Sequence, residues 1–298
     1  MPRSKSMILP YLSLFAATFL WASSFIALKT AFTVYDPMVV IFGRMIIALI
    51  FILLFLKPLR NIQFRKHDFK YLLFLGFCEP CLYFVFEAIA LKNTSASQAG
   101  MVTATLPLIV AIPAWFFLKE EMTARKILGF TLAVGGVVLL SIGSDVTENA
   151  PNPLFGNFME FMAMVAASGY IITMRYLSTS YSSLFVTSFQ AFIGSIFFLP
   201  LLALPTTTLP TSFEILPVLA IIYLGIFVTF GAYGSYNYAI SKIPASQATA
   251  FINLIPVFTL VMGVLILGDK LTLMQGIAIV IVFLGIYVSQ MKSKTKQP

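Results

Sequence analysis

Ten long apolar runs constrain this chain more than any other feature. A helix that crosses a bilayer needs about 20 mainly apolar residues. We place such runs at residues 8–33, 38–56, 71–91, 97–118, 124–142, 155–174, 183–204, 214–240, 246–267 and 273–291. The runs are continuous rather than short and alternating, which favours helices over a membrane β-barrel. Only 10% of the residues are charged, whereas soluble domains carry about 25%, so the predicted fold class is an all-α membrane protein.

A repeated tetrapeptide divides the chain into two halves. Ala96-Ser97-Gln98-Ala99 recurs as Ala245-Ser246-Gln247-Ala248, and Pro107 and Pro256 follow the two copies at the same distance. The same offset joins further identical residues, namely Ala90 with Ala239, Leu118 with Leu267, Thr123 with Thr272 and Gly136 with Gly285. This gapless match indicates an internal duplication, which is the first feature to look for in a sequence.

Five spans per half is an odd number, so the second half must enter the membrane from the side opposite to the first. We therefore expect two inverted five-helix repeats around a central cavity, an arrangement common in secondary transporters. The predicted domains are a first repeat at 1–143, an extracytoplasmic linker at 144–154 and a second repeat at 155–298.

The net charge of +8 is explained by membrane topology rather than by nucleic-acid binding. Lysines and arginines gather in alternate connections, such as Arg65, Lys66 and Lys70, while the other side carries acidic residues such as Asp145 and Glu148. By the positive-inside rule this bias places both termini in the cytoplasm of a multi-pass protein of the plasma (inner) membrane. The expected partners are the lipid bilayer and a small-molecule solute, with no nucleic acid.

The first two spans carry three candidate binding residues. Trp21 lies near mid-membrane, where it either packs on a neighbouring helix, with Ser24 as a small contact residue, or donates its indole N–H into a cavity. Arg44 in the second span must face a partner or a cavity, because a charge in lipid is costly. It is either a structural residue, a ligand for a substrate carboxylate, or an electrostatic gate.

The third span is the most polar. Spacings of four residues put Glu79, Tyr83 and Glu87 roughly on one helical face. A buried carboxyl group tends to take up a proton, so these glutamates are candidates for proton coupling or substrate binding. The alternative for Glu87 is an ion pair with Arg44 at similar depth. Glu160 of the sixth span is a further proton-coupling candidate, an interfacial carboxylate, or a partner of Arg44.

Spans four and nine carry polar residues and matching prolines. These are Gln98, Thr103 and Pro107 in the first half, and Gln247, Asn253 and Pro256 in the second. Proline frees a backbone carbonyl one turn earlier, and paired interrupted spans point to a transport site; simple kinks are the alternative. From spans six and eight we add Tyr170, Tyr236 and Asn237 as binding candidates, with Tyr236 at the repeat position of Glu87.

The glycines and cysteines give less information about function. Glycines such as Gly129, Gly136 and Gly285 suit close helix contact in spans five and ten, which we assign a scaffold role, with a homodimer contact as a further candidate use. Cys78 and Cys81 have no second pair and no histidine nearby. We predict no metal site, no cofactor and no catalytic residues.

Taken together, these residues resemble a known family. The ten spans, Trp21-Ala22-Ser23-Ser24, Arg44 and the doubled pattern are similar to the EamA family of the drug/metabolite transporter superfamily. The doubled pattern comprises Ser97, Ala99, Pro107, Glu120 or Glu121 and Thr123, then Ser246, Ala248, Pro256, Asp269 and Thr272. The resemblance implies a central cavity and the export or exchange of small metabolites, often amino acids, by alternating access. Glu79 and Glu87 depart from the family pattern and mark a special substrate or coupling ion.

The leading functional hypothesis is therefore a secondary transporter of amino acids or related small metabolites. A carrier of drugs or other metabolites, including nucleotide-like or cationic solutes, is the alternative. A membrane enzyme acting on lipid-linked substrates would need grouped carboxylates, histidines or a nucleophile with a base, and the polar groups here are sparse and scattered. A structural or receptor protein is a third class. The sequence has no phosphate-binding Gly-x-x-x-x-Gly-Lys-Ser/Thr signature, so we expect no direct use of ATP.

Overall fold

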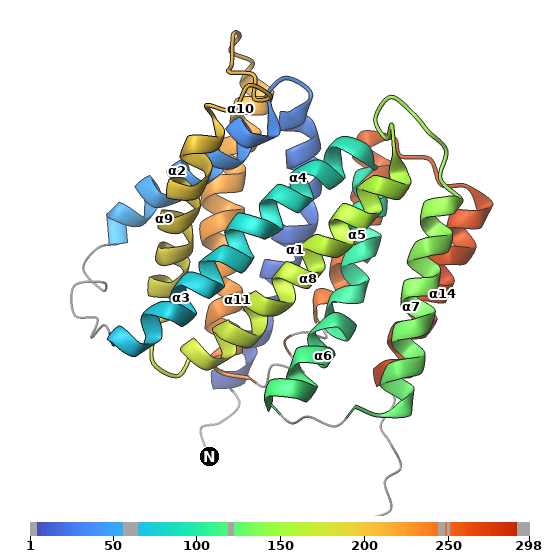
Figure 1. Cartoon of the computed structure of the whole chain (residues 1–298), viewed down its shortest axis with the longest axis horizontal. Helices are drawn as coiled ribbons and strands as arrows, with labels where there is room; N and C mark the ends of the chain where they lie inside the picture. The colour runs from blue at the N-terminus through green and yellow to red at the C-terminus, as the bar shows by residue number, and fades with distance from the viewer. Residues whose placement is uncertain (1–4, 56–64, 119–121, 244–247, 249–250, 291–298) are drawn as a thin grey trace, which may run out of the picture.

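The protein is a bundle of helices. Its computed structural model describes residues 5–55, 65–118, 122–243, 248 and 251–290. Within these ranges the helices lie side by side (Figure 1), and the only extended pairing is an isolated bridge between Thr147 and Ala150. This is the all-α fold that the continuous apolar runs predict.

The helices follow one another with short connections. In chain order the α-helices are α1 (Lys5–Phe32), α2 (Pro37–Ile52), α3 (Phe69–Gly76), α4 (Tyr83–Asn93), α5 (Ala96–Val102), α6 (Leu106–Leu118), α7 (Ala124–Ile142), α8 (Pro153–Leu177), α9 (Ser183–Leu201), α10 (Ile215–Tyr223), α11 (Tyr233–Ile240), α13 (Leu254–Met262) and α14 (Leu273–Gln290). Tighter 3₁₀ turns are η1 (Leu53–Phe55), η3 (Lys66–Asp68) and η5 (Thr103–Thr105), and wider π-helical segments are η4 (Phe77–Leu82), η6 (Leu224–Ala232) and η7 (Gly263–Leu267).

Seven helical segments in the described ranges are long and apolar enough to cross a bilayer. The runs predicted at 38–56, 246–267 and 273–291 correspond to shorter apolar helices, Pro37–Ile52, Leu254–Leu267 and Leu273–Ser289. Large apolar side chains such as Phe117 and Leu273 are exposed on the outside of the bundle, as lipid contact requires. The protein is an integral membrane protein, while the count of ten spans stays a prediction.

Polar caps decide where several spans begin. Asp36 accepts a hydrogen bond from Met38 N ahead of Pro37, which opens α2. The duplicated threonines cap helices in the same way. Thr123 Oγ1 accepts from Lys126 N at the start of α7, and Thr272 Oγ1 accepts from Gln275 N at the start of α14. The repeated motif thus encodes a matching helix start in each half.

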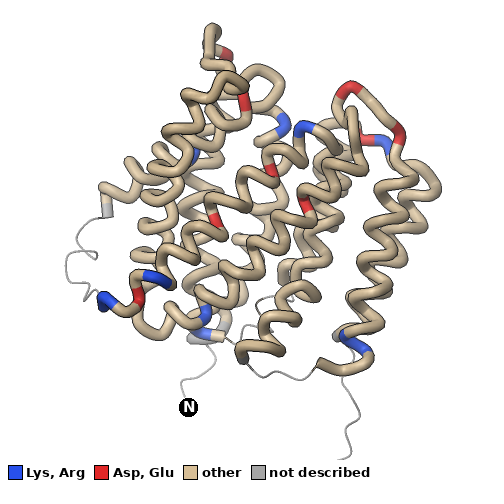
Figure 2. Tube along the Cα trace, in the orientation of Figure 1, with Lys and Arg blue, Asp and Glu red and all other residues tan. Residues whose placement is uncertain are grey.

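The two halves run in opposite directions. In Figure 1 α1 leads away from the end at which the N-terminus lies, whereas α8, at the corresponding place in the second half, runs back toward that end. Figure 2 shows that lysine and arginine dominate the N-terminal end, and that the opposite end carries many of the acidic residues together with a few lysines. This is the charge distribution expected from the sequence.

Helices α7 and α14 pair at one edge of the bundle (Figure 1). Glycine makes the close approach possible, because a Cβ at Gly129 would lie 2.5 Å from the carbonyl oxygen of Gly285, and one at Gly136 would lie 2.7 Å from Val282 Cγ2. These glycines are used within one chain, as the scaffold role predicts. A homodimer contact through the same two helices stays a prediction.

Candidate functional site

Matching interruptions in two spans shape the centre of the molecule. The π-helical segments η4 and η6 lie at corresponding places of the two halves, since the duplication offset carries Phe77–Leu82 onto residues inside Leu224–Ala232. Within η4, Glu79 has non-helical angles (φ −148°, ψ 113°) and precedes Pro80. These angles take the Glu79 carbonyl out of the helical hydrogen-bond pattern, and it accepts a hydrogen bond from Gln190 Nε2 at 3.1 Å instead. The break directs the Glu79 side chain toward the space between the halves.

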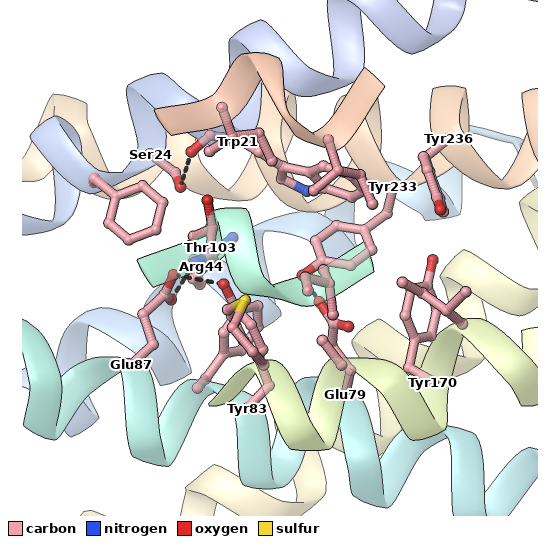
Figure 3. A pocket seen from close by; sticks show the side chains of 18 residues that line it. Trp21, Ser24, Arg44, Glu79, Tyr83, Glu87, Thr103, Tyr170, Tyr233 and Tyr236 are labelled. Carbon is pink, nitrogen blue, oxygen red and sulfur yellow. Dashed lines mark hydrogen bonds and ion pairs between the residues drawn. The ribbon is translucent and has the colours of Figure 1, made fainter. Parts of the chain in front are cut away.

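A cavity of about 40 Å³ lies in this space. Figure 3 shows its wall, to which both halves contribute. The lining residues are Trp21, Ser24, Phe25, Arg44, Glu79, Tyr83, Phe84, Glu87, Thr103, Leu106, Met164, Ala167, Tyr170, Ile171, Tyr233, Tyr236, Ile252 and Ile255. The volume is room for a few water molecules, so the walls must separate further to take a solute the size of an amino acid.

Arg44 is fixed on three sides in this wall. Its Nε donates a hydrogen bond to Thr229 Oγ1 at 3.0 Å, and its guanidinium carbon lies 4.3 Å from the centre of the Phe84 ring. Its Nη1 lies 4.0 Å from Glu87 Oε2, an ion pair that is too long for a hydrogen bond. The side chain is 1% exposed, so the guanidinium has little freedom to turn.

Glu87 stands opposite Arg44 from another helix. Its Oε1 accepts a hydrogen bond from the Tyr83 hydroxyl at 3.1 Å, while its Oε2 faces Arg44. The ion pair between Glu87 and Arg44, which the sequence offered as one alternative, is therefore present. Figure 3 shows Tyr83, Glu87 and Arg44 grouped on one side of the cavity, with Ser24 and Thr103 beside them.

Aromatic residues group around Glu79 on the other side. The Tyr233 hydroxyl donates a hydrogen bond to Glu79 Oε1, and the ring centres of Trp21 and Tyr233 are 5.3 Å apart, edge to face. The Trp21 ring also lies 4.9 Å from that of Tyr236. The Tyr170 hydroxyl donates to Asn237 Oδ1 at 2.7 Å. This side combines one carboxyl group with flat apolar surfaces.

Several buried polar atoms of the wall lack a hydrogen-bond partner within the described part of the chain. They are Trp21 Nε1, Arg44 Nη1, Glu87 Oε2 and the Tyr236 hydroxyl. Buried polar groups normally have partners, and an orphan calls for an explanation. Because these atoms belong to residues of one cavity wall, a polar solute that supplies both acceptors and donors would satisfy them together.

Nine of the predicted binding residues line the cavity: Trp21, Ser24, Arg44, Glu79, Tyr83, Glu87, Thr103, Tyr170 and Tyr236. Gln98 does not. Its Oε1 instead accepts hydrogen bonds from Ser144 Oγ at 2.7 Å and Asn157 Nδ2 at 2.9 Å in a separate buried network. Asn237 lies behind Tyr170 and donates to Thr187 Oγ1 at 2.9 Å.

Three further residues that were predicted to bind the solute, Pro107, Pro256 and Asn253, do not line the cavity. Pro107 follows the 3₁₀ turn η5, as a proline interruption predicts, but neither it nor Pro256 is in the cavity wall. Asn253 is half-buried outside the wall, and its Oδ1 has no partner among the residues described here. Gln247 lies outside the described residues.

Glu160 is fully buried in α8, so it is not an interfacial carboxylate in water. Neither of its oxygens has a hydrogen-bond partner in the described ranges, and Arg44 pairs with Glu87 instead. Glu160 is also absent from the cavity wall. A proton on this carboxyl is the simplest way to avoid an unpaired charge in the interior.

Sequence reasoning did not single out three residues that shape the site: Phe84 under the guanidinium, Thr229 at its Nε, and Tyr233 at Glu79. A signal was present for two of them. Phe84 and Tyr233 occupy matching positions at the duplication offset, and both line the cavity. Aligning the third span with the eighth at the repeat offset would have identified both residues.

Comparisons with known proteins agree with this architecture. The model of the EamA-like transporter family matches residues 8–142 and 154–291. A Bacillus subtilis protein named "Uncharacterized transporter YetK" is 26% identical over 231 residues, covering 77% of this chain and 70% of the relative. A Streptantibioticus cattleyicolor protein named "Probable terminal-alkyne amino-acid exporter" is 24% identical over 252 residues, covering 84% of this chain and 82% of the relative. One solved crystal structure shares the fold, with a TM-score of 0.64 at 17% identity and 97% coverage of both chains.

Proposed function

Because the chain belongs to the EamA-like transporter family, we propose that it exports or exchanges amino acids or closely related small metabolites by alternating access. Family membership makes the protein a transporter and not an enzyme. The observation that carries the substrate class is the Arg44 guanidinium. Its Nε donates a hydrogen bond to Thr229, and its Nη1 has no hydrogen-bond partner among the described residues. The guanidinium lines a cavity whose other side is aromatic.

The chemistry of the wall supports a solute with a carboxylate and an amine. A carboxylate would accept hydrogen bonds from Arg44 Nη1 and Trp21 Nε1, and charge-assisted bonds of this kind are strong. An ammonium group would find a carboxyl group in Glu79. Apolar residues such as Leu106, Ile171 and Ile255 would contact an aliphatic side chain. The relative named as an amino-acid exporter, at 24% identity, points the same way.

Alternating access supplies the transport cycle. The cavity lies between inverted halves and is too small for the solute as it stands. Rocking of one half against the other would widen it toward one side and then the other. The charge bias in Figure 2 supports cytoplasmic termini in the plasma (inner) membrane.

One observation favours a second candidate, a carrier of cationic amines. Two carboxyl groups, those of Glu79 and Glu87, line the cavity, whereas Arg44 is the one cation of the described wall. A solute that carries only positive charge would use this surplus of carboxyl groups. The two candidates differ in whether a ligand needs a carboxylate.

A thermal-shift screen of the purified protein separates them. The ligands are amino acids, nucleosides and cationic drugs, and a matched trio: L-leucine, 4-methylpentanoate (no amine) and 3-methylbutylamine (no carboxylate). We expect leucine to raise the melting temperature most, and we expect Arg44→Ala to abolish the response to both carboxylate ligands. Trp21→Ala should weaken the same two responses. A response to 3-methylbutylamine that equals the leucine response and survives Arg44→Ala would replace the amino-acid proposal with the cationic one.

A further inference from the structure

We infer that Asp269 closes the cavity to the extracytoplasmic side: its carboxylate holds the second half against the start of α5, and this contact breaks each time the cavity opens outward. The contact between Asp269, Ser97 and Gly263 is called the outer latch below. The inference rests on the proposed function, including its orientation in the membrane, and adds to it the residues that control access to the site.

The outer latch joins the two copies of the repeated pattern. Ser97 comes from the first copy and lies in the first turn of α5, whereas Asp269 comes from the second copy and follows η7. Ser97 N donates a hydrogen bond to Asp269 Oδ2 at 3.0 Å. The first amides of a helix have no partner inside that helix, and a carboxylate is a strong acceptor for them. The two halves are therefore held together by residues that the duplication itself supplies.

The outer latch lies at the end of the bundle away from the N-terminus. Helix α1 leads toward this end (Figure 1) and carries Lys29 in its last turn. Lys29 Nζ donates a hydrogen bond to the carbonyl oxygen of Asn149 at 2.6 Å, and its positive charge attracts the Asp269 carboxylate. Three segments thus meet here, namely α1, the linker between the halves and the turn that follows η7.

This end is separated from the cavity by part of each helix. The same spans line the cavity further along, through Thr103, six residues after Ser97, and through Ile255, eight residues before Gly263. A helix rises by about 1.5 Å per residue, so the outer latch lies about 9–12 Å from the cavity wall. Ser97 is fully buried. The contact can therefore close the outward path without taking part in solute binding.

Glycine allows the two segments of the outer latch to touch. A Cβ at Gly263 would collide with Ser97 Oγ and would lie 2.8 Å from Asp269 Oδ2. Ser97 Oγ is itself buried without a hydrogen-bond partner in the ranges that the structure describes, which lowers the stability of the closed contact. One charge-assisted hydrogen bond therefore provides most of the polar attraction, as suits a contact that has to break and form again.

A second connection at the same end behaves as scaffold. Thr272 Oγ1 donates a hydrogen bond to the carbonyl oxygen of Gly143 at 3.0 Å, which ties the start of α14 to the end of α7. Between this tie and η7 lies Gly268, whose positive φ of 71° is easy for glycine only. The chain can turn at Gly268, so a rocking motion could separate η7 from α5 while α7 and α14 stay paired.

A cross-link tests whether the outer latch must open. A Cβ at Gly263 would lie 3.4 Å from Ser97 Cβ, close to the spacing of about 3.5–4.5 Å in a disulfide. Exchange of radiolabelled L-leucine is measured in liposomes that contain the whole protein with Ser97→Cys and Gly263→Cys. We expect oxidation to slow exchange at least tenfold and a reductant to restore it. The matched control combines Gly143→Cys with Met274→Cys, whose Cβ atoms would be 3.1 Å apart. It joins α7 to α14 at the same end, and oxidation should leave its exchange within about twofold.

A second measurement needs no solute. Ser24→Cys places a thiol in the cavity wall, and a membrane-impermeant thiol reagent is added outside intact cells. Mass spectrometry gives the rate of labelling at position 24. We expect Asp269→Ala to raise this rate about tenfold, because the closed state loses a hydrogen bond to a charged group. Asp269→Asn keeps an acceptor oxygen without the charge and should give an intermediate rate. Asp145→Asn changes an exposed acidic residue of the linker and should leave the rate unchanged.

The two measurements distinguish the failure of each proposal. If the wild type exchanges no leucine but Asp269→Ala speeds labelling, the proposed substrate class fails and the outer latch stands. If leucine is exchanged equally fast by the cross-linked and the reduced protein, the contact is a permanent brace and the inference alone is overturned. A labelling rate in Asp269→Ala equal to that of the parent protein also overturns it. Should Asp269→Ala fail to reach the membrane, the cross-link decides, because each protein is compared with its own reduced form.

Discussion

The two walls of the cavity match in position and differ in chemistry. The duplication offset pairs lining residues across the halves: Trp21 with Tyr170, Phe84 with Tyr233, Glu87 with Tyr236, Thr103 with Ile252 and Leu106 with Ile255. Yet Arg44, Glu79 and Glu87 all belong to the first half, and within the described wall the second half offers hydroxyl and apolar groups only. Duplication has fixed the shape of the site, and divergence of one copy has supplied its charges.

The pairing of α7 with α14 gives the opposite case. There the halves match in chemistry as well, since Gly136 and Gly285 are identical residues at the same offset and both allow close contact. A scaffold needs the same packing from each copy, whereas a site for an asymmetric solute does not. The charged first-half wall and the matched glycine contact are therefore expected to respond differently to substitution.

The largest effect should come from removing the cation of the first-half wall. We expect Arg44→Met to raise the dissociation constant for L-leucine about tenfold to a hundredfold, because a hydrogen bond to a charged group contributes about 1.5–3 kcal/mol. Titration calorimetry on the purified protein measures the change. Ile193 occupies the corresponding position of the second half, and Ile193→Met should leave the constant within about twofold. Equal losses in the two variants would remove the claim that charge distinguishes the walls.

The glycine contact should show a loss of stability instead. We expect Gly129→Ala to cost about 1–3 kcal/mol by overpacking, because its Cβ would meet the backbone of α14 at 2.5 Å. At Gly135 an added Cβ would have no atom within 4 Å, so Gly135→Ala should change stability by less than about 1 kcal/mol. Unfolding in mixed detergent compares them. If Gly135→Ala were the more damaging variant and also changed the oligomeric state, the glycines would serve a dimer contact and not the scaffold.

The sequence predicted the fold class and much of the charged wall, but not which face of each helix turns inward. Arg44 and Glu87 were paired by depth alone, and the ion pair is present. Gln98 was expected in the cavity because it is a polar residue of a span with a matching proline in each half, but it faces the buried network with Asn157. Where a helix is apolar on every side, one polar residue does not show which side faces the centre of the bundle. The hydrogen-bond partner Asn157 lies 59 positions later in the chain, so a local sequence pattern cannot predict this contact.

The network around Gln98 provides a test between site and scaffold. Its Oε1 accepts from three side chains, those of Thr94, Ser144 and Asn157. We expect Gln98→Met to lower stability by about 1–2 kcal/mol, since a buried network loses an acceptor that three donors share, although each donor keeps a second acceptor. Leucine affinity should change less than twofold. Thermal unfolding and calorimetry on one preparation give both values. A large loss of affinity at unchanged stability would return Gln98 to the binding site.

The smallest effect concerns two neighbouring tyrosines of the second-half wall. The Tyr233 hydroxyl donates to Glu79 of the first half, whereas the Tyr236 hydroxyl has no partner among the described residues. Tyr233→Phe should therefore lower the free energy of unfolding by about 1 kcal/mol, the usual net value of such a bond, and Tyr236→Phe should leave it unchanged or slightly higher. With leucine bound, the order should reverse if the Tyr236 hydroxyl bonds the solute, because only then does its loss remove a contact. Chemical unfolding with and without leucine measures both changes in the free energy of unfolding. Equal values for the two variants in both conditions would mean that the two tyrosines contribute only to the shape of the cavity. The first half would then provide all the polar contacts to the solute.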